Sequence, residues 1–188
     1  MATHFKTIGP LELKRTAGHV DRVSLAALWA RANAVEAGLA RAVGVYVIAT
    51  SKGGILTPWY VGKSDNGFKN RLSEKHHAFN LIANSQPKGS LYLFLLAKVS
   101  SKKGVLAKPP KKKFVEFGDE FKSRRKPRKS INKLEFLLIR SCLLRNTELV
   151  NAKEKTFYAG LVVPGYLSDE QNDLSDSAMS LAKMLRTS

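Results

Sequence analysis

Two short runs of β-branched and aromatic residues, separated by a turn with two glycines, constrain the fold of this chain most strongly. Residues 44–50 (GVYVIAT) and 57–63 (TPWYVGK) have the composition of strands, and Ser51-Lys52-Gly53-Gly54 lies between them. Glycine adopts the positive φ angles of tight turns at no steric cost. The pattern therefore predicts a β-hairpin over residues 44–63.

Helix and strand signals alternate after the hairpin. Residues 64–66 offer capping side chains, and apolar residues then recur at helical spacing from Phe68 to Ile82. Residues 91–99 are predominantly apolar and predict a buried central strand, whereas residues 134–144 predict a strongly apolar helix. The expected order is strand, strand, helix, strand, basic insert and helix.

Two further helices are expected in the flanking segments. Ser24 is the predicted cap of an amphipathic helix over residues 24–42, and acidic residues from Asp169 to Asp176 precede an apolar stripe typical of a terminal helix. A length of 188 residues fits one domain with a modest appendage.

Positive charge is the abnormal feature of the composition. The chain has 32 Lys and Arg against 15 Asp and Glu, a formal net charge of +17, and such a field favours polyanions as partners. Residues 101–130 hold twelve of these basic residues and three acids. Because prolines and like charges oppose regular helix there, most of this insert is expected to be a loop or an extended arm.

The basic insert has two interpretations, a solvated charge run or a nucleic-acid-binding arm. Its length, its position between core elements and its interleaved phenylalanines (Phe114, Phe117 and Phe121) favour the arm. Its contacts would go mainly to phosphates and position the substrate without specifying sequence. The candidate contact residues are Lys102, Lys103, Lys111, Lys112, Lys113, Arg124, Arg125, Lys126, Arg128 and Lys129.

A single cysteine, Cys142, excludes an internal disulfide and any zinc site built on several thiolates. A reducing, cytoplasmic compartment is the simplest expectation. The apolar runs are too short to cross a bilayer, and the first residues lack the apolar region of an export signal. Neither a membrane anchor nor a membrane partner is expected.

Five features occur in a fixed order: Gly44-Val45-Tyr46, Tyr60-Val61-Gly62-Lys63, Arg71, Glu135 and Asn151. In this combination the chain resembles the GIY-YIG nuclease superfamily from Gly44 to Asn151. The resemblance implies an α+β fold with a small three-stranded antiparallel sheet flanked by helices. It divides the chain into a helical N-terminal extension (1–43), a nuclease core (44–152) that includes the basic insert, and a C-terminal extension with a terminal helix (153–188).

The pleat of the paired strands predicts that the two tyrosines lie in one cleft. Tyr46 and Tyr60 can share a face of paired strands, and the neighbouring glycines leave room beside them. Two tyrosines in a hairpin are also simply good strand formers. A phenol with a pKa of about 10 is a poor base at neutral pH and needs a cation nearby, for which Lys63 is the candidate.

Arg71 and Glu135 are the candidate charged groups of the site. A guanidinium can grip phosphate oxygens in a bidentate fork, although Arg71 could instead pair with Glu74 on a helix surface. Glu135 has the spacing of a capping box with Asn132, yet it also lies on an apolar stripe, where an ionised carboxylate needs a cationic partner. The resemblance implies that Glu135 holds Mg²⁺ or Mn²⁺, which fits the way Mg²⁺ binds few carboxylates and many waters.

Three further polar residues are candidates for supporting roles: Lys75, His76 and Asn151. Many members of the superfamily place a histidine one helical turn after the arginine, where this chain has Lys75 followed by His76 and His77. Lys75 and His76 are therefore candidate auxiliary residues, and a half-buried helix side chain is the alternative for His76. By resemblance, Asn151 would orient the site or contact phosphate.

These residues predict a metal-dependent endonuclease that hydrolyses phosphodiester bonds in DNA. Tyr46 would accept or relay a proton, Tyr60 and Lys63 would support it, Arg71 would bind the scissile phosphate and Glu135 would hold the metal. Restriction, homing and repair roles, and RNA as the polymer, are all compatible with the pattern. The alternative is a non-catalytic nucleic-acid-binding protein that retains the fold.

Overall fold

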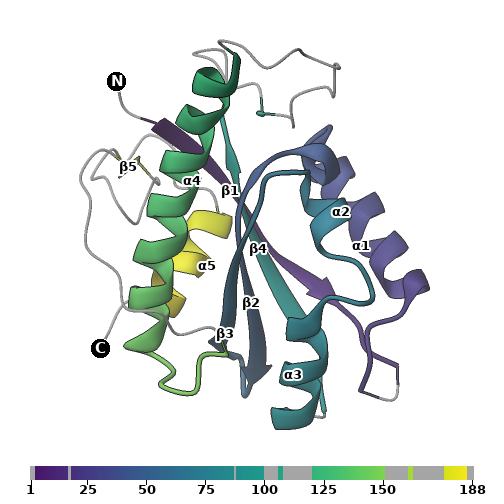
Figure 1. Cartoon of the computed structure of the whole chain (residues 1–188). Coiled ribbons are helices and arrows are strands. Elements are labelled where there is room, and N and C mark those ends of the chain that lie inside the picture. The colour runs from purple at the N-terminus through teal and green to yellow at the C-terminus, as the bar shows by residue number, and fades with distance from the viewer. Residues whose placement is uncertain are drawn as a thin grey trace.

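The strands of the described residues form one sheet in the computed structural model, which describes residues 3–16, 18–86, 88–99, 106–107, 120–150, 161–162 and 176–185 (Figure 1). The strand order is β3-β2-β4-β1-β5. Strands β1 (Thr3–Leu13), β2 (Gly44–Lys52), β3 (Ile55–Ser64) and β4 (Leu91–Lys98) pair antiparallel, whereas the short β5 (Leu161–Val162) pairs parallel with β1. The fold is therefore α+β, as the sequence predicts.

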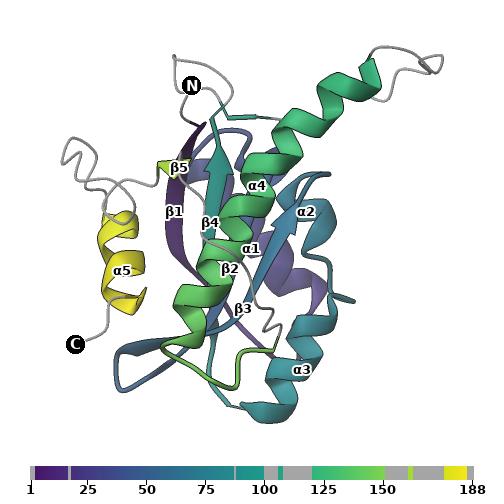
Figure 2. The same ribbon diagram turned by 60° about the vertical axis from the view of Figure 1, so that its left-hand side comes forward.

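Helices cover both faces of the sheet. One face carries α1 (Arg22–Val35), the 3-10 helix η1 (Leu39–Arg41), α2 (Phe68–Arg71) and α3 (His77–Ser85). The opposite face carries α4 (Glu120–Leu143) and α5 (Asp176–Leu185), and Figure 2 shows α4 lying across this face with α1 behind the sheet. Among the described residues, no helix combines the length and the apolar character that crossing a bilayer requires.

Strand β2 is buried on both sides because it lies between these two layers. Val45, Val47 and Ala49 belong to the core under α4, whereas Tyr46 and Ile48 belong to the core under α1 and α3. Burial on both faces explains why this strand is almost continuously apolar. It also separates Tyr46 from the residues that contact α4.

The predicted hairpin is confirmed, with β2 and β3 joined at Gly53 and Gly54, which both have positive φ. Ile48 lies opposite Tyr60 but Ala49 lies opposite Pro58, so Trp59 is an extra residue in β3. This bulge lets the adjacent Trp59 and Tyr60 both join the core under α1 and α3. The helix expected after the hairpin is instead two short helices, α2 and α3.

The expected three strands are one too few, because the N-terminal segment contributes β1 as a fourth antiparallel strand. It pairs with β4, for example Phe5 with Lys98 and Leu13 with Leu91. The predicted helix in this segment is present as α1, but it ends at Val35 and not at residue 42, because Glu36 is extended and Gly38 turns the chain with a positive φ before η1. Its cap is Asp21, whose Oδ1 accepts a hydrogen bond from the Ser24 N–H at 2.7 Å. Ser24 is therefore inside the helix.

The expectation of a loop or arm across residues 101–130 is wrong for its last third. Helix α4 begins at Glu120, so the basic run from Arg124 to Lys129 is helical despite Pro127. Lysine and arginine have high helix propensity, and this run continues directly into the apolar stripe that packs on β2 and β3. The side chains of Lys102, Lys103, Lys111, Lys112 and Lys113 lie outside the described residues.

Candidate active site

Tyr46 and Tyr60 meet on the face of the sheet under α1 and α3, as the pleat predicts. Their rings stack with centroids 6.0 Å apart and an interplanar angle of 26°. Gly62 lies opposite Tyr46, and a Cβ there would overlap the Tyr46 hydroxyl and approach Tyr60 Cε1 to 2.7 Å. A Cβ at Gly44 would likewise overlap the carbonyl oxygen of Leu96. The prediction that glycine leaves room beside the phenols is confirmed for Gly62, whereas Gly44 makes room for the backbone of β4.

Gly62→Ala is expected to lower the free energy of unfolding by about 1–3 kcal/mol, because the added methyl group forces the two tyrosine rings apart. Chemical denaturation measures this change. Gly53→Asn is the matched control: Gly53 has a φ of +58°, and its Cβ would meet no atom within 4 Å. Asparagine tolerates this backbone region, so the control is expected to stay within about 0.5 kcal/mol of wild type. A Gly62→Ala variant as stable as the control would contradict the crowded geometry.

His76 completes the contact with Tyr46 from the N-terminus of α3. It is 5% exposed, and its Nε2 lies 2.7 Å from Tyr46 Oη. Its Nδ1 accepts a hydrogen bond from the Ala78 N–H at 3.3 Å, as an N-cap side chain does. A neutral His76 therefore carries its proton on Nε2 and donates it to the Tyr46 oxygen.

Burial holds these groups in their neutral forms at pH 7. It raises the pKa of Tyr46 well above its usual value, and Tyr60 adds to this shift while the charge of Arg71 opposes it. The pKa of Tyr60 is raised by burial in the same way, again against the charge of Arg71. Burial, with smaller effects of Arg71 and His77, lowers the pKa of His76 to about 4.

This shift predicts that acid destabilises the fold through His76. As the pH falls below about 6.5, the unfolded imidazole takes up a proton but the folded one does not, so the unfolded state binds more protons. The free energy of unfolding should then fall by up to about 3 kcal/mol between about pH 7 and about pH 4. Chemical denaturation at several pH values should show that the His76→Gln variant lacks this pH-dependent fall in the free energy of unfolding. The His19→Gln variant, changed at an exposed histidine, should retain it. An unchanged pH dependence in His76→Gln would refute the assignment.

Arg71 ends α2 beside the two phenols and lowers the pKa of both. Its side chain is exposed, so it can also reach a ligand. The alternative pairing of Arg71 with Glu74 is not what the structure contains, because Glu74 Oε2 accepts a hydrogen bond from Arg22 Nε at 2.8 Å. Arg71 therefore lies beside the buried phenols and is also accessible to a ligand from solvent.

Glu135 reaches the site from α4 on the opposite face of the sheet. Its Oε2 lies 2.9 Å from Lys63 Nζ, and the charge of Glu135 contributes to the raised pKa of Tyr60. Asn132 lies inside α4, so the alternative in which Glu135 closes a capping box is excluded. The glutamate side chain is 13% exposed, and the cationic partner that its burial requires is Lys63.

The carboxylate of Glu135 suits a divalent cation that keeps most of its hydration water. Within the described residues, no group of three or more His, Cys, Asp or Glu side chains could hold a metal ion. Glu135 offers one carboxylate, of which Lys63 engages one oxygen. Mg²⁺ keeps much of its water and binds through one or two carboxylates and substrate phosphates, so this single group fits it.

The remaining predicted residues are distributed unevenly around the site. Lys75 is exposed and lines a groove toward α1. Asn151 lies outside the described residues, but the N–H of Val150 donates to the Trp59 carbonyl at 3.0 Å, which brings the chain beside Tyr60. In the basic run of α4, Lys129 has a described side chain, which is exposed.

His77 is a member of the site that the sequence pattern did not select. Its ring stacks on His76 with centroids 4.9 Å apart and meets Tyr60 edge-on at 5.4 Å. Its position next to His76 in the sequence was the available signal. Three aromatic rings thus contact Tyr60: Tyr46, His76 and His77.

Comparison with protein-family models, with curated proteins and with solved structures finds no match to this chain.

Proposed function

We propose that this chain is a metal-dependent endonuclease of the GIY-YIG type that hydrolyses phosphodiester bonds in DNA. The observation that supports this most is the convergence of side chains from four separate elements around the edge strand β3. Tyr46 comes from β2, Arg71 from α2, His76 from the start of α3 and Glu135 from α4. Perturbed titratable groups beside exposed cations are typical of catalytic sites.

The proposed roles follow from contacts and charge. Arg71 binds the scissile phosphate with its planar fork and stabilises the charge that develops as the bond breaks. Tyr46 and Tyr60 orient the attacking water. Tyr46, neutral at pH 7, would relay the proton by taking it from the water while passing its own hydroxyl proton to a phosphate oxygen, and the positive charge of Arg71 stabilises negative charge that develops on the two phenol oxygens. His76 positions the Tyr46 hydroxyl and stabilises negative charge on its oxygen.

Glu135 would hold Mg²⁺ or Mn²⁺, with Lys63 sharing the carboxylate. When bound, the ion supplies Lewis-acid charge at the phosphate and an acidified water. Lys63 Nζ fixes the Glu135 side chain at the edge of β3 and limits its charge until an ion competes for the carboxylate.

The Lys63–Glu135 ion pair also favours a second candidate, a nucleic-acid-binding protein without catalysis, because the pair already compensates the carboxylate. The test that separates them is cleavage of plasmid, linear, branched and single-stranded DNA with Mg²⁺, Mn²⁺ or a chelator. Metal-dependent products support the endonuclease. Binding to these substrates without any product would establish the second candidate.

The basic insert and the first turns of α4 are expected to attach DNA without taking part in the chemistry. On duplex DNA each phosphate contact contributes about 0.9 to the log–log salt slope, so even ~4 contacts contribute roughly 3 to 4. Replacing the ten candidate contact residues of residues 101–130 by Gln should flatten the slope. Single-turnover cleavage at saturating enzyme should change little. An unchanged slope would make the segment a solvated charge run, and lost cleavage at saturation would make it part of the active site.

A further inference from the structure

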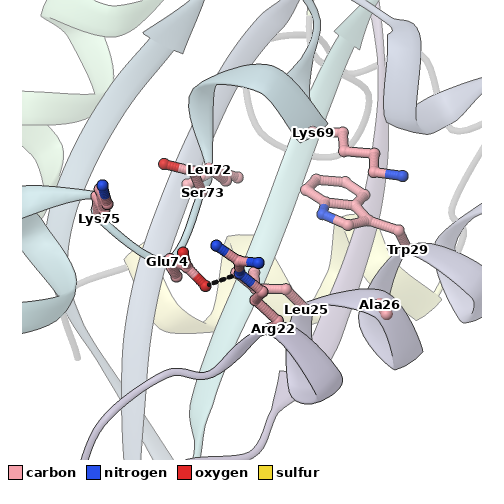
Figure 3. Close-up of a pocket in the computed structure, with 9 residues that line it drawn as sticks. All are labelled: Arg22, Leu25, Ala26, Trp29, Lys69, Leu72, Ser73, Glu74 and Lys75. Atoms are coloured by element: carbon pink, nitrogen blue, oxygen red, sulfur yellow. Dashed lines mark hydrogen bonds and ion pairs between the residues drawn. The ribbon is translucent and has the colours of Figure 1, made fainter.

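A groove lies between α1 and a facing segment, residues 69–75, which spans the end of α2 and the connection toward α3 (Figure 3). The segment includes Arg71 and ends next to His76, so the groove adjoins the candidate active site along the chain. The groove encloses about 320 Å³. Helix α1 supplies Leu25 and Trp29, and the facing segment supplies Leu72, so the floor is apolar. A pocket of this size accommodates a group such as a nucleobase.

The rim of the groove is positively charged. Lys69 and Lys75 are exposed and stand at the two ends of the facing segment, and Figure 3 shows Lys69 beside the Trp29 ring. Glu74 is the one acidic residue in the lining, and Arg22 neutralises it with a 2.8 Å ion pair that ties α1 to this segment. With three cations (Arg22, Lys69 and Lys75) against one acid, the lining carries a net charge of +2 around an apolar floor.

The position of these cations relates the groove to Arg71. Lys69 lies two residues before Arg71 and Lys75 precedes His76, so the groove wall and the candidate active site belong to one continuous stretch of chain. A strand whose phosphate binds Arg71 would bring its neighbouring nucleotides to this groove. Stacked bases of a duplex do not present their faces, whereas unstacked bases of a single strand do.

We propose that this groove holds one unstacked base of a single-stranded nucleic-acid segment, with its flanking phosphates on Lys69 and Lys75. The proposal rests on the proposed function in that Arg71 holds the adjacent phosphate. It gives α1 a role: the helix forms the far wall of a substrate groove. A base packed on the apolar floor, with its two phosphates on the cationic rim, matches both the apolar character and the positive charge of the groove.

Trp29 provides a direct readout, because the chain has two tryptophans and Trp59→Phe leaves Trp29 alone. The Trp59→Phe protein is titrated with single-stranded DNA in the presence of a chelator, after its melting temperature confirms the fold. Trp29 fluorescence should be quenched by single-stranded oligonucleotides, and less by a fully abasic oligonucleotide of equal length or by a duplex. Equal quenching by the abasic oligonucleotide would overturn the base-binding site.

Charge variants provide the second test. Lys69→Gln with Lys75→Gln should weaken single-strand binding about tenfold at moderate salt. The control pair, Lys52→Gln with Lys88→Gln, removes the same charge from exposed sites that do not line the groove and should change binding less than about twofold. Equal losses in the two pairs, or displacement of the oligonucleotide by an acidic peptide that itself quenches Trp29, would overturn the proposal.

The endonuclease proposal and the base-binding proposal can be refuted independently. Binding is measured without metal, so a protein that never cleaves DNA can still show base-dependent quenching of Trp29. Conversely, metal-dependent cleavage without that quenching would leave the endonuclease standing and remove the groove.

Discussion

Glu135→Gln is expected to reduce metal-dependent cleavage on the order of a hundredfold or more while leaving the fold intact. The amide removes the negative charge that a hydrated Mg²⁺ needs. Its carbonyl oxygen can still accept the hydrogen bond from Lys63 Nζ that Glu135 Oε2 accepts at 2.9 Å. Glutamine is also a good helix former, so α4 should be undisturbed. Single-turnover cleavage and thermal melting, measured on the same preparation, test both parts.

Glu148→Gln is the matched control for this variant. Glu148 is exposed in the segment after α4, so the same change of charge there should leave cleavage near wild type. Near-normal cleavage by Glu135→Gln would remove the metal from the proposal. A loss of melting temperature with normal cleavage would make Glu135 a structural partner of Lys63.

The parts of the fold that the sequence predicts correctly are those fixed by local signals. Gly53 and Gly54 determine the hairpin turn. The turn fixes the strand register, and this register places Tyr46 opposite Gly62. Strand β1 has no comparable local signal. Its residues pair with β4 some eighty positions later in the chain, and that tertiary pairing determines its structure.

The start of α4 was missed because two local rules opposed a third. Pro127 and the repulsion among basic residues argued against a helix, whereas high helix propensity and the adjacent apolar stripe argued for one. The same boundary decides the role of Glu135. Because Asn132 lies inside the helix, Asn132 and Glu135 cannot cap its N-terminus.

The candidate site divides in the same way. The stacking of Tyr46 and Tyr60 follows from strand periodicity, which is visible in the sequence. The contact of His76 with Tyr46 depends on where α3 begins, and the break between α2 and α3 at residues 72–76 was not predicted. Lys75, which lines the groove, and His76, which is buried, are neighbours in this non-helical connection.

Arg71→Lys is expected to lower turnover on the order of a hundredfold while weakening DNA binding by less than about tenfold. Lysine keeps the positive charge that attracts phosphate and that lowers the pKa of Tyr46 and Tyr60. It loses the planar fork, so it cannot contact a phosphate bidentately while remaining beside both phenols. The loss should therefore fall on the transition state, where charge develops on the phosphate oxygens.

Two measurements distinguish a transition-state role of Arg71 from simple anchoring of the substrate. They are the cleavage rate at saturating enzyme and a separate binding titration without metal. Arg31→Lys is the control, because Arg31 is exposed on α1 and its guanidinium hydrogen-bonds the carbonyl of Glu12. It should leave both measurements near wild type. If binding and turnover fall together in Arg71→Lys, the residue anchors the substrate and the transition-state role is wrong. A selective loss of turnover would instead assign to Arg71 the one group that touches both the phenols and the reacting phosphate.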